Sequence, residues 1–74
     1  MQLSTDGGIY LIRNLRTRRV YAGEAANLAL RRSTHFSALR RGKHHNPQLQ
    51  DDFRIHGEAS FVFEIAAFIR DAKL

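Results

Sequence analysis

Apolar and polar positions near the start of the chain follow the pattern of a β-hairpin. Residues 8–14 are rich in β-branched and aromatic side chains, which is typical of a strand. Residues 14–19 are polar and rich in arginine, as in a hairpin loop. Residues 20–22 form a second short strand, which Gly23 is expected to end. The pattern therefore predicts two antiparallel strands joined by a basic turn.

Farther along the chain, helical spacing replaces this pattern. Residues 25–41 predict the main helix, because apolar residues such as Leu28 and Leu39 recur with a period of about 3.6 residues. Gly42 is a typical residue for the end of that helix, and the arginines before it suit the negative end of the helix dipole.

A second helix and a third strand complete the predicted elements. Asn46 is a suitable N-cap, Pro47 suits the first turn, and Gly57 is expected to end this helix. Residues 60–66 alternate in the manner of a strand. Residues 68–74 either begin another helix or trail off. The side chains expected on one face of the strand are Phe61, Phe63 and Ile65.

The order of these elements predicts the fold class. The sequence reads β-β-α-α-β with an optional last helix, which is the pattern of a small α+β domain. Its sheet would be three-stranded and antiparallel, with two or three helices packed on it. A length of 74 residues allows a single domain, spanning residues 1–74.

Composition excludes several classes of protein. The chain has no cysteine, so neither a disulfide nor a thiolate–metal site can reinforce its core. No apolar run approaches the roughly 20 residues needed to span a bilayer, and the first residues lack the pattern of a signal peptide. We therefore expect an intracellular protein, in the cytoplasm or associated with the nucleoid, and no membrane partner.

Positive charge is concentrated in the first two thirds of the chain. Residues 7–50 hold nine of the twelve basic residues but one acidic residue, Glu24, and the whole chain carries a net charge of +5. Ten of the twelve are arginines, whose flat guanidinium binds phosphate oxygens in pairs. This bias favours nucleic acid as the partner over a basic surface that serves only solubility. The residues expected to contact DNA are Arg13, Arg16, Arg18, Arg19, Arg32, Arg40, Arg41 and Lys43.

A smaller set of residues has the chemistry to bind and hydrolyse a phosphodiester. Tyr10 and Tyr21 lie on neighbouring predicted strands, and their hydroxyls can converge if both face the same side of the sheet. Arg31 and His35 lie four residues apart and so share one face of the main helix, and His44 follows that helix. A guanidinium neutralises charge on a phosphate, and an imidazole transfers protons near neutral pH.

Each of these residues also has a purely structural interpretation. The tyrosines could be ordinary strand residues with their hydroxyls at the rim of the core, and either histidine at 44 and 45 could be a simple loop residue. As a spaced pair that precedes Arg31 and His35, however, the tyrosines favour the catalytic interpretation. A zinc site is a further alternative, although no spacing here resembles a known zinc finger. Its ligands would come from His35, His44, His45 and His56.

Two tripeptides carry a resemblance to a known family. Gly8-Ile9-Tyr10 and, after ten residues, Tyr21-Ala22-Gly23 resemble the pair of motifs that names the GIY-YIG nuclease family, with alanine where isoleucine or valine is usual. Arg31 and His35 follow at the spacing found in the family. The resemblance covers residues 7–66, which is most of the chain.

The resemblance implies a role for each candidate residue. Tyr10 and Tyr21 would line the active-site face of the sheet, and one of them would hold or activate the attacking water. Arg31 would clamp the scissile phosphate. His35 would orient Tyr10 or accept its proton, and His44 would bind the phosphate or complete the hydrogen-bond network. The family further implies that an active domain uses Mg²⁺ or Mn²⁺ as its cofactor.

The resemblance has one gap, at the metal ligand. The family holds its divalent metal with a glutamate on a later helix, and neither Glu24, Glu58 nor Glu64 occupies the matching position. By this resemblance the domain is truncated at its C-terminus. Three explanations are open: the sequence is a fragment of a longer nuclease, a partner supplies the carboxylate, or the domain binds nucleic acid without cutting it.

These observations leave three functions open. The first is a DNA endonuclease that hydrolyses phosphodiester bonds with a divalent metal. The second is a non-cleaving DNA-binding module derived from such a nuclease, acting as a repressor or competitor, and the third is a basic protein–protein adaptor. We also expect a homodimer, because a missing last helix would expose apolar side chains. Those side chains are Phe61, Phe63 and Phe68.

Overall fold

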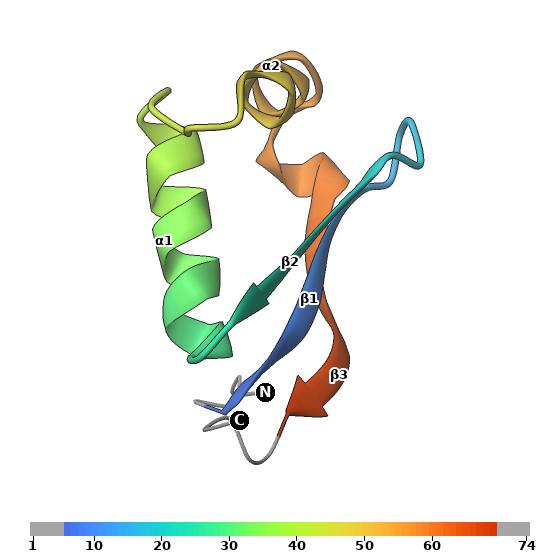
Figure 1. The fold of residues 1–74 in the computed structure, drawn as a ribbon. Coiled ribbons are helices and arrows are strands. Elements are labelled where there is room, and N and C mark those ends of the chain that lie inside the picture. The colour runs from blue at the N-terminus through green and yellow to red at the C-terminus, as the bar shows by residue number, and fades with distance from the viewer. Residues whose placement is uncertain (1–5, 70–74) are drawn as a thin grey trace.

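A three-stranded antiparallel sheet and two α-helices make up the domain (Figure 1). The computed structural model describes residues 6–69. The strands lie in the order β2-β1-β3, so β1 is central, and the predicted α+β fold is confirmed. In chain order the elements are β1 (Gly7–Asn14), β2 (Val20–Ala25), α1 (Leu28–Arg40), α2 (Pro47–His56), a short 3₁₀ helix η1 (Glu58–Ser60) and β3 (Phe61–Ile69).

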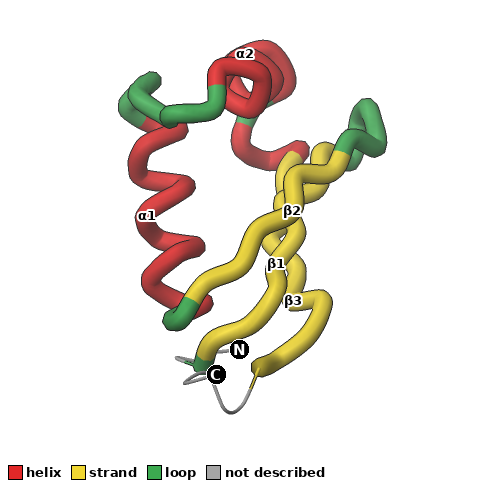
Figure 2. Tube along the Cα trace, in the orientation of Figure 1, coloured by secondary structure: helices red, strands yellow, loops and turns green. Residues whose placement is uncertain are grey.

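Both α-helices lie on the same side of the sheet, as Figures 1 and 2 show. On β1, Tyr10, Ile12 and Asn14 are buried on this side, and the residues between them are partly exposed. The register pairs Ile12 with Tyr21 on β2 and with Phe63 on β3. Because directly paired residues project to the same side of a sheet, Tyr10 and Tyr21 share the helix-covered face.

The boundary between β2 and α1 differs from the prediction. β2 does not end at Gly23 but continues through it to Ala25, and α1 begins at Leu28 instead of at residue 25. Gly23 pairs with Tyr10, and a β-carbon at Gly23 would lie 2.4 Å from the Tyr10 hydroxyl oxygen. Gly23 therefore makes room for a ring instead of ending a strand. The helix starts where the Asn27 side chain accepts a hydrogen bond from the backbone N–H of Leu30.

The predicted limits of α2 are confirmed. The Asn46 side chain accepts hydrogen bonds from the backbone N–H groups of Gln48 and Leu49, and Pro47 occupies the first turn. Gly57 ends the helix with a φ of 83°, in the left-handed region that favours glycine. These local signals set the position of the loop between the two helices.

The third strand is longer than predicted. β3 runs from Phe61 to Ile69, so Phe68 extends the strand and does not begin a helix, while residue 60 lies in η1. The rest of that predicted last helix lies outside the described residues. Phe61 is buried and Phe63 is partly buried against the core, so the expectation that both are exposed is wrong. Phe68 is 54% exposed, as expected.

The core lies between the sheet and the helices. Leu28 and Leu39 of α1 and Leu49 of α2 are almost completely buried. The aromatic ring of Phe53 packs against two other rings of the core. Its centroid lies 6.3 Å from that of Phe36 and 5.5 Å from that of Phe61. Within the described part of the chain, no helix has the length and apolar character that crossing a membrane requires.

Candidate active site

Three side chains from three segments form a continuous line of hydrogen bonds. The Tyr10 hydroxyl lies 2.6 Å from His35 Nε2, and His35 Nδ1 lies 2.7 Å from His44 Nε2. Tyr10 comes from β1, His35 from α1 and His44 from the loop after α1. Tyr10 and His35 are both buried. The fold thus joins three of the five predicted catalytic residues through direct contacts.

Both imidazoles of this line are held neutral near pH 7. Burial lowers the pKa of His35 to about 4, and the nearby His44, Arg31 and His45 act in the same direction. Burial and His45 also lower the pKa of His44. The ring of His44 stacks between its neighbours, with centroids 4.9 Å from His35 and 4.5 Å from His45. A neutral imidazole can accept a proton or a hydrogen bond, as general acid–base chemistry requires.

Arg31 borders the same site. With His35, His44 and His45, it lines a pocket of about 150 Å³. Its Nη1 donates a hydrogen bond to the backbone oxygen of Glu24, 3.2 Å away, at the end of β2. Arg31 and His35 therefore lie on the same side of α1, as their spacing predicts, and an anion in this pocket would contact both a guanidinium and imidazoles.

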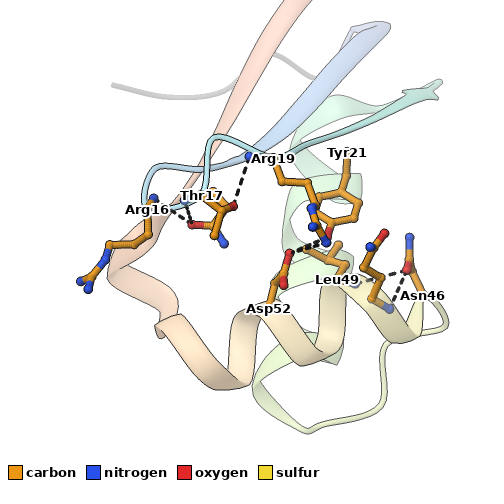
Figure 3. Close-up of polar contacts among 9 residues, drawn as sticks. Arg16, Thr17, Arg19, Tyr21, Asn46, Leu49 and Asp52 are labelled. Carbon is orange, nitrogen blue, oxygen red and sulfur yellow. Dashed lines mark hydrogen bonds and ion pairs between the residues drawn. The ribbon is translucent and has the colours of Figure 1, made fainter.

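The fifth predicted residue, Tyr21, is held by a different partner. Its hydroxyl donates to Asp52 Oδ2 on α2 at 2.6 Å, and Arg19 Nη1 lies 3.6 Å from the same oxygen (Figure 3). Burial and the hydrogen bond to Asp52 raise the pKa of Tyr21. The two tyrosines share a face of the sheet, but each hydroxyl has its own partner: an imidazole for Tyr10 and a carboxylate for Tyr21.

Residues 6–73 match the GIY-YIG catalytic domain. The chain belongs to this family. The resemblance seen in the two tripeptides is therefore confirmed, and the fold described above is that of a GIY-YIG domain.

Besides matching the family, the chain is similar to one protein sequence and to two solved structures. The GIY-YIG domain is 39% identical over 61 residues to the intron-associated endonuclease 1 of Enterobacteria phage T4. The aligned region makes up 78% of this chain and 25% of the relative. It is also similar to solved structures of the catalytic domain of the homing endonuclease I-TevI, at 34% identity and a TM-score of 0.84 over 92% of this chain and 73% of that one. A mutant form of the I-TevI catalytic domain gives 36% identity and a TM-score of 0.81, over 90% and 68% of the two chains. The chain thus spans about a quarter of the length of its phage relative.

Three of the arginines predicted to contact DNA are paired with acids of the GIY-YIG domain itself. The pairs are Arg13–Glu64, Arg19–Asp52 and Arg40–Glu58, with N–O distances of 3.0, 3.6 and 2.6 Å. All three arginine side chains keep more than a third of their surface exposed. Such exposed pairs contribute little stability, so a phosphate can compete for the guanidinium.

The other predicted DNA contacts are exposed and lie in the hairpin loop, on α1 and in the turn that follows α1. Arg16 and Arg18 are in the hairpin loop, where Arg18 has a φ of 69°. Arg32 lies over the ring of Phe36, with its guanidinium carbon 5.2 Å from the centroid. The remaining two, Arg41 and Lys43, follow the end of α1 and are exposed. Contact of these residues with DNA stays a prediction.

The metal site expected from the family is not formed by the part of the chain that the structure describes. Among residues 6–69, no group of three or more histidine, aspartate or glutamate side chains is placed to hold a metal ion. The four histidines therefore do not assemble the alternative zinc site. Asp52 is engaged by Tyr21 and Arg19, and Glu24 lines a neighbouring cavity that shares Arg31 with the pocket of the histidines. These residues do not fit a Mg²⁺ or Mn²⁺ site on their own.

Two residues that bear on the site were missed by the sequence analysis. Asp52 gives no local signal in the sequence, because its contact with Tyr21 spans 31 positions and depends on how α2 packs on β2. The second residue is Gln50. It lies within hydrogen-bond distance of both α1 and the loop that carries His44. A polar residue in the first turns of a helix gives no local signal of such contacts.

Proposed function

We propose that this GIY-YIG domain is the catalytic part of an endonuclease that hydrolyses phosphodiester bonds in duplex DNA. The observation that carries the proposal is the line of hydrogen bonds from Tyr10 through His35 to His44, beside the guanidinium of Arg31. It combines groups that move protons with a group that binds phosphate. The names of the relatives, which are endonucleases, support the same reaction class.

The proposed roles follow from charge and hydrogen bonding. Arg31 binds an oxygen of the scissile phosphate and stabilises the negative charge that develops during attack. Tyr10, hydrogen-bonded to neutral His35, holds and orients the attacking water. Tyr21 positions the substrate with a hydroxyl that keeps its proton, because burial and Asp52 raise its pKa.

The proposed cofactor is Mg²⁺ or Mn²⁺, as the family resemblance implies. When bound, such an ion would act as a Lewis acid on the phosphate. Residues 6–69 do not hold it on their own. The requirement is tested by adding either cation to the cleavage assay and by removing it with a chelator.

Conversion of supercoiled plasmid to the nicked form is the direct test. We expect nicking by the 74-residue chain, and a loss of at least about 100-fold in Arg31→Ala, the scale of removing a preorganised charge. The matched control is Arg32→Ala, which removes the adjacent guanidinium, stacked on Phe36 and outside the pocket. Equal rates for the two variants would contradict the assignment of Arg31.

A non-cleaving DNA-binding module is the second candidate. The observation in its favour is that no acid lines the pocket of Arg31 and the histidines, and that residues 6–69 form no group of three or more side chains placed to hold a metal ion. A gel shift at two salt concentrations, performed on the preparation used for nicking, separates the two candidates. Retarded DNA without nicking in either cation would favour the binding module.

Two further proposals concern the setting in which the domain works. Because the proposed substrate is DNA, we expect the domain to act in the cytoplasm or at the nucleoid. The exposed Phe68 favours self-association through β3, which is an edge strand of the sheet. Sedimentation should then show a concentration-dependent dimer that Phe68→Ser weakens, and a monomer at all concentrations would rule the dimer out.

A further inference from the structure

The side chain of Gln50, on α2, forms hydrogen bonds to the last turn of α1 and to the loop that carries His44. Its Nε2 donates a hydrogen bond to the backbone oxygen of Leu39 at 3.1 Å, and its Oε1 accepts one from the backbone N–H of His44 at 2.9 Å. One partner can only accept and the other can only donate, so the amide has a single orientation. Gln50 thereby fixes the loop between α1 and α2 to the last turn of α1.

The fixed loop brings a backbone N–H to the ring of His44. Asn46 donates its N–H to His44 Nδ1 at 3.1 Å. The position of Asn46 is itself held, because its side chain caps α2 through hydrogen bonds that include the one to Leu49 drawn in Figure 3. A backbone N–H cannot accept a hydrogen bond, so Nδ1 of His44 carries no proton.

One proton position then determines the next. A neutral His44 that lacks a proton on Nδ1 carries it on Nε2, which donates to His35 Nδ1. His35 must in turn carry its proton on Nε2 and donate it to the Tyr10 oxygen. The phenol is therefore the acceptor at the end of the line, and its own proton is free to be donated elsewhere.

We propose that Gln50 is a positioning residue that sets the direction of these hydrogen bonds, through the loop that it pins and the N–H of Asn46. The catalytic meaning of this arrangement rests on the proposed endonuclease function, whereas the arrangement itself does not. The titratable and charged groups that face the two imidazoles are Tyr10 from β1, Arg31 from α1 and His45 from the loop. None of these three is a carboxylate that would favour an imidazolium, and the lowered pKa values of both rings are consistent with neutral forms.

Nitrogen-15 NMR of the histidine rings in the DNA-free 74-residue protein tests the proposal, because it separates protonated from unprotonated ring nitrogens. At pH 7 we expect both His35 and His44 to carry the proton on Nε2. In Gln50→Ala the Nδ1 resonance of His44 should shift toward the protonated value as a second tautomer becomes populated. The matched control is Gln48→Ala, on the same helix, where the side chain is exposed and makes no hydrogen bond among the described residues.

Each outcome bears on the proposal. Protonated Nδ1 on His44 in the unmodified protein would overturn it, as would a folded Gln50→Ala with unchanged ring resonances. If Gln50→Ala fails to fold by circular dichroism, Gln50→Met keeps the volume without the hydrogen bonds and is measured in its place. Where the unmodified protein nicks DNA, Gln50→Ala should lower the rate about tenfold, the low end for groups that orient a functional imidazole. Absence of nicking would count against the endonuclease but would leave the NMR result decisive for Gln50.

Discussion

Tyr10 and Tyr21 carry the same functional group in opposite hydrogen-bond roles. The Tyr10 oxygen accepts a hydrogen bond from His35 at a buried position, whereas the Tyr21 hydroxyl donates one to Asp52, a carboxylate with 15% of its side chain exposed. Replacing each with phenylalanine removes the oxygen and keeps the ring. The consequences should differ, because the partner left behind is a buried N–H in one case and a partly solvated carboxylate in the other.

We expect Tyr10→Phe to lower the free energy of unfolding by about 1–3 kcal/mol, the cost of leaving a buried donor unsatisfied. Tyr21→Phe should cost about 0.5–1.5 kcal/mol, because Asp52 keeps Arg19 and water as partners. Urea denaturation of both variants measures the difference. If Tyr21→Phe proves the more destabilising change, the assigned hydrogen-bond roles are wrong.

Acid should destabilise the domain through His35. The pKa of His35 is about 4 in the folded domain and about 6.5 for an unperturbed histidine, so between these values the unfolded chain binds more protons than the folded one. The stabilisation is complete above pH 6.5 and is lost as the pH falls toward 4. We expect a loss of about 2 kcal/mol, discounted from the full shift because solvent screens part of it. Thermal unfolding at several pH values would show it.

Two variants separate His35 from other titrating groups. His35→Asn removes the imidazole and should flatten the dependence of stability on pH in this window. His56→Asn removes a histidine at the end of α2, away from the pocket, and should preserve the dependence. His44 contributes in the same direction as His35, because its pKa is also lowered. An unchanged pH dependence in His35→Asn would show that another group controls acid stability.

At the scale of elements, Gly23 decides whether Tyr10 can reach His35. A β-carbon at this position would lie 2.4 Å from the Tyr10 oxygen and 2.5 Å from the ring carbon that bears it. We expect Gly23→Ala to push the ring aside, break the hydrogen bond to His35 and lower stability by about 1–3 kcal/mol, as overpacking does. The His35 ring resonances and urea denaturation report the two effects.

Ala22→Val is the matched control for that substitution. Ala22 is exposed and pairs with Leu11, so its side chain projects from the opposite side of the sheet. We expect this variant to keep the His35 resonances unchanged. A Gly23→Ala variant that also keeps them would mean that Tyr10 does not depend on the glycine.

The elements themselves show what the sequence can and cannot predict. Local signals were sufficient for α2, where Asn46, Pro47 and Gly57 act on their immediate neighbours. The end of β2 was misplaced, because Gly23 is required by a ring on another strand and not by its own backbone. Similarly, the contact of Asp52 with Tyr21 is a product of packing between elements and has no signature in the order of residues.

The same distinction between local signals and packing between elements applies to the candidate site. Arg31 and His35 could be paired from their spacing on one helix, and the family resemblance supplied the order of tyrosines, arginine and histidine. The link from His35 to His44 depends on the course of the loop after α1, which is fixed by Gln50. Spacing along the chain could therefore name the residues of the site but not their hydrogen-bond partners.

At the scale of the whole molecule, the net charge of +5 favours binding to a polyanion, but not every arginine is equally available. Arg13 forms an ion pair with Glu64 across neighbouring strands. Arg16 lies exposed in the hairpin loop, and its side chain points away from the other labelled residues in Figure 3. Its guanidinium makes no ion pair with any of the described residues.

This difference predicts how DNA affinity depends on salt. If Arg16 contacts a phosphate, Arg16→Ala should reduce the slope of log K against log[salt] by about 0.9, the value for one released counterion. Arg13→Ala should change the slope less. In the DNA-free protein the charge of Arg13 is already neutralised by Glu64, and DNA binding must first break that ion pair. Titrations of a fluorescent duplex at four salt concentrations give the slopes. Equal changes in both variants would mean that the ion pair opens at no cost, and unchanged slopes in both would place the DNA on a surface away from the hairpin.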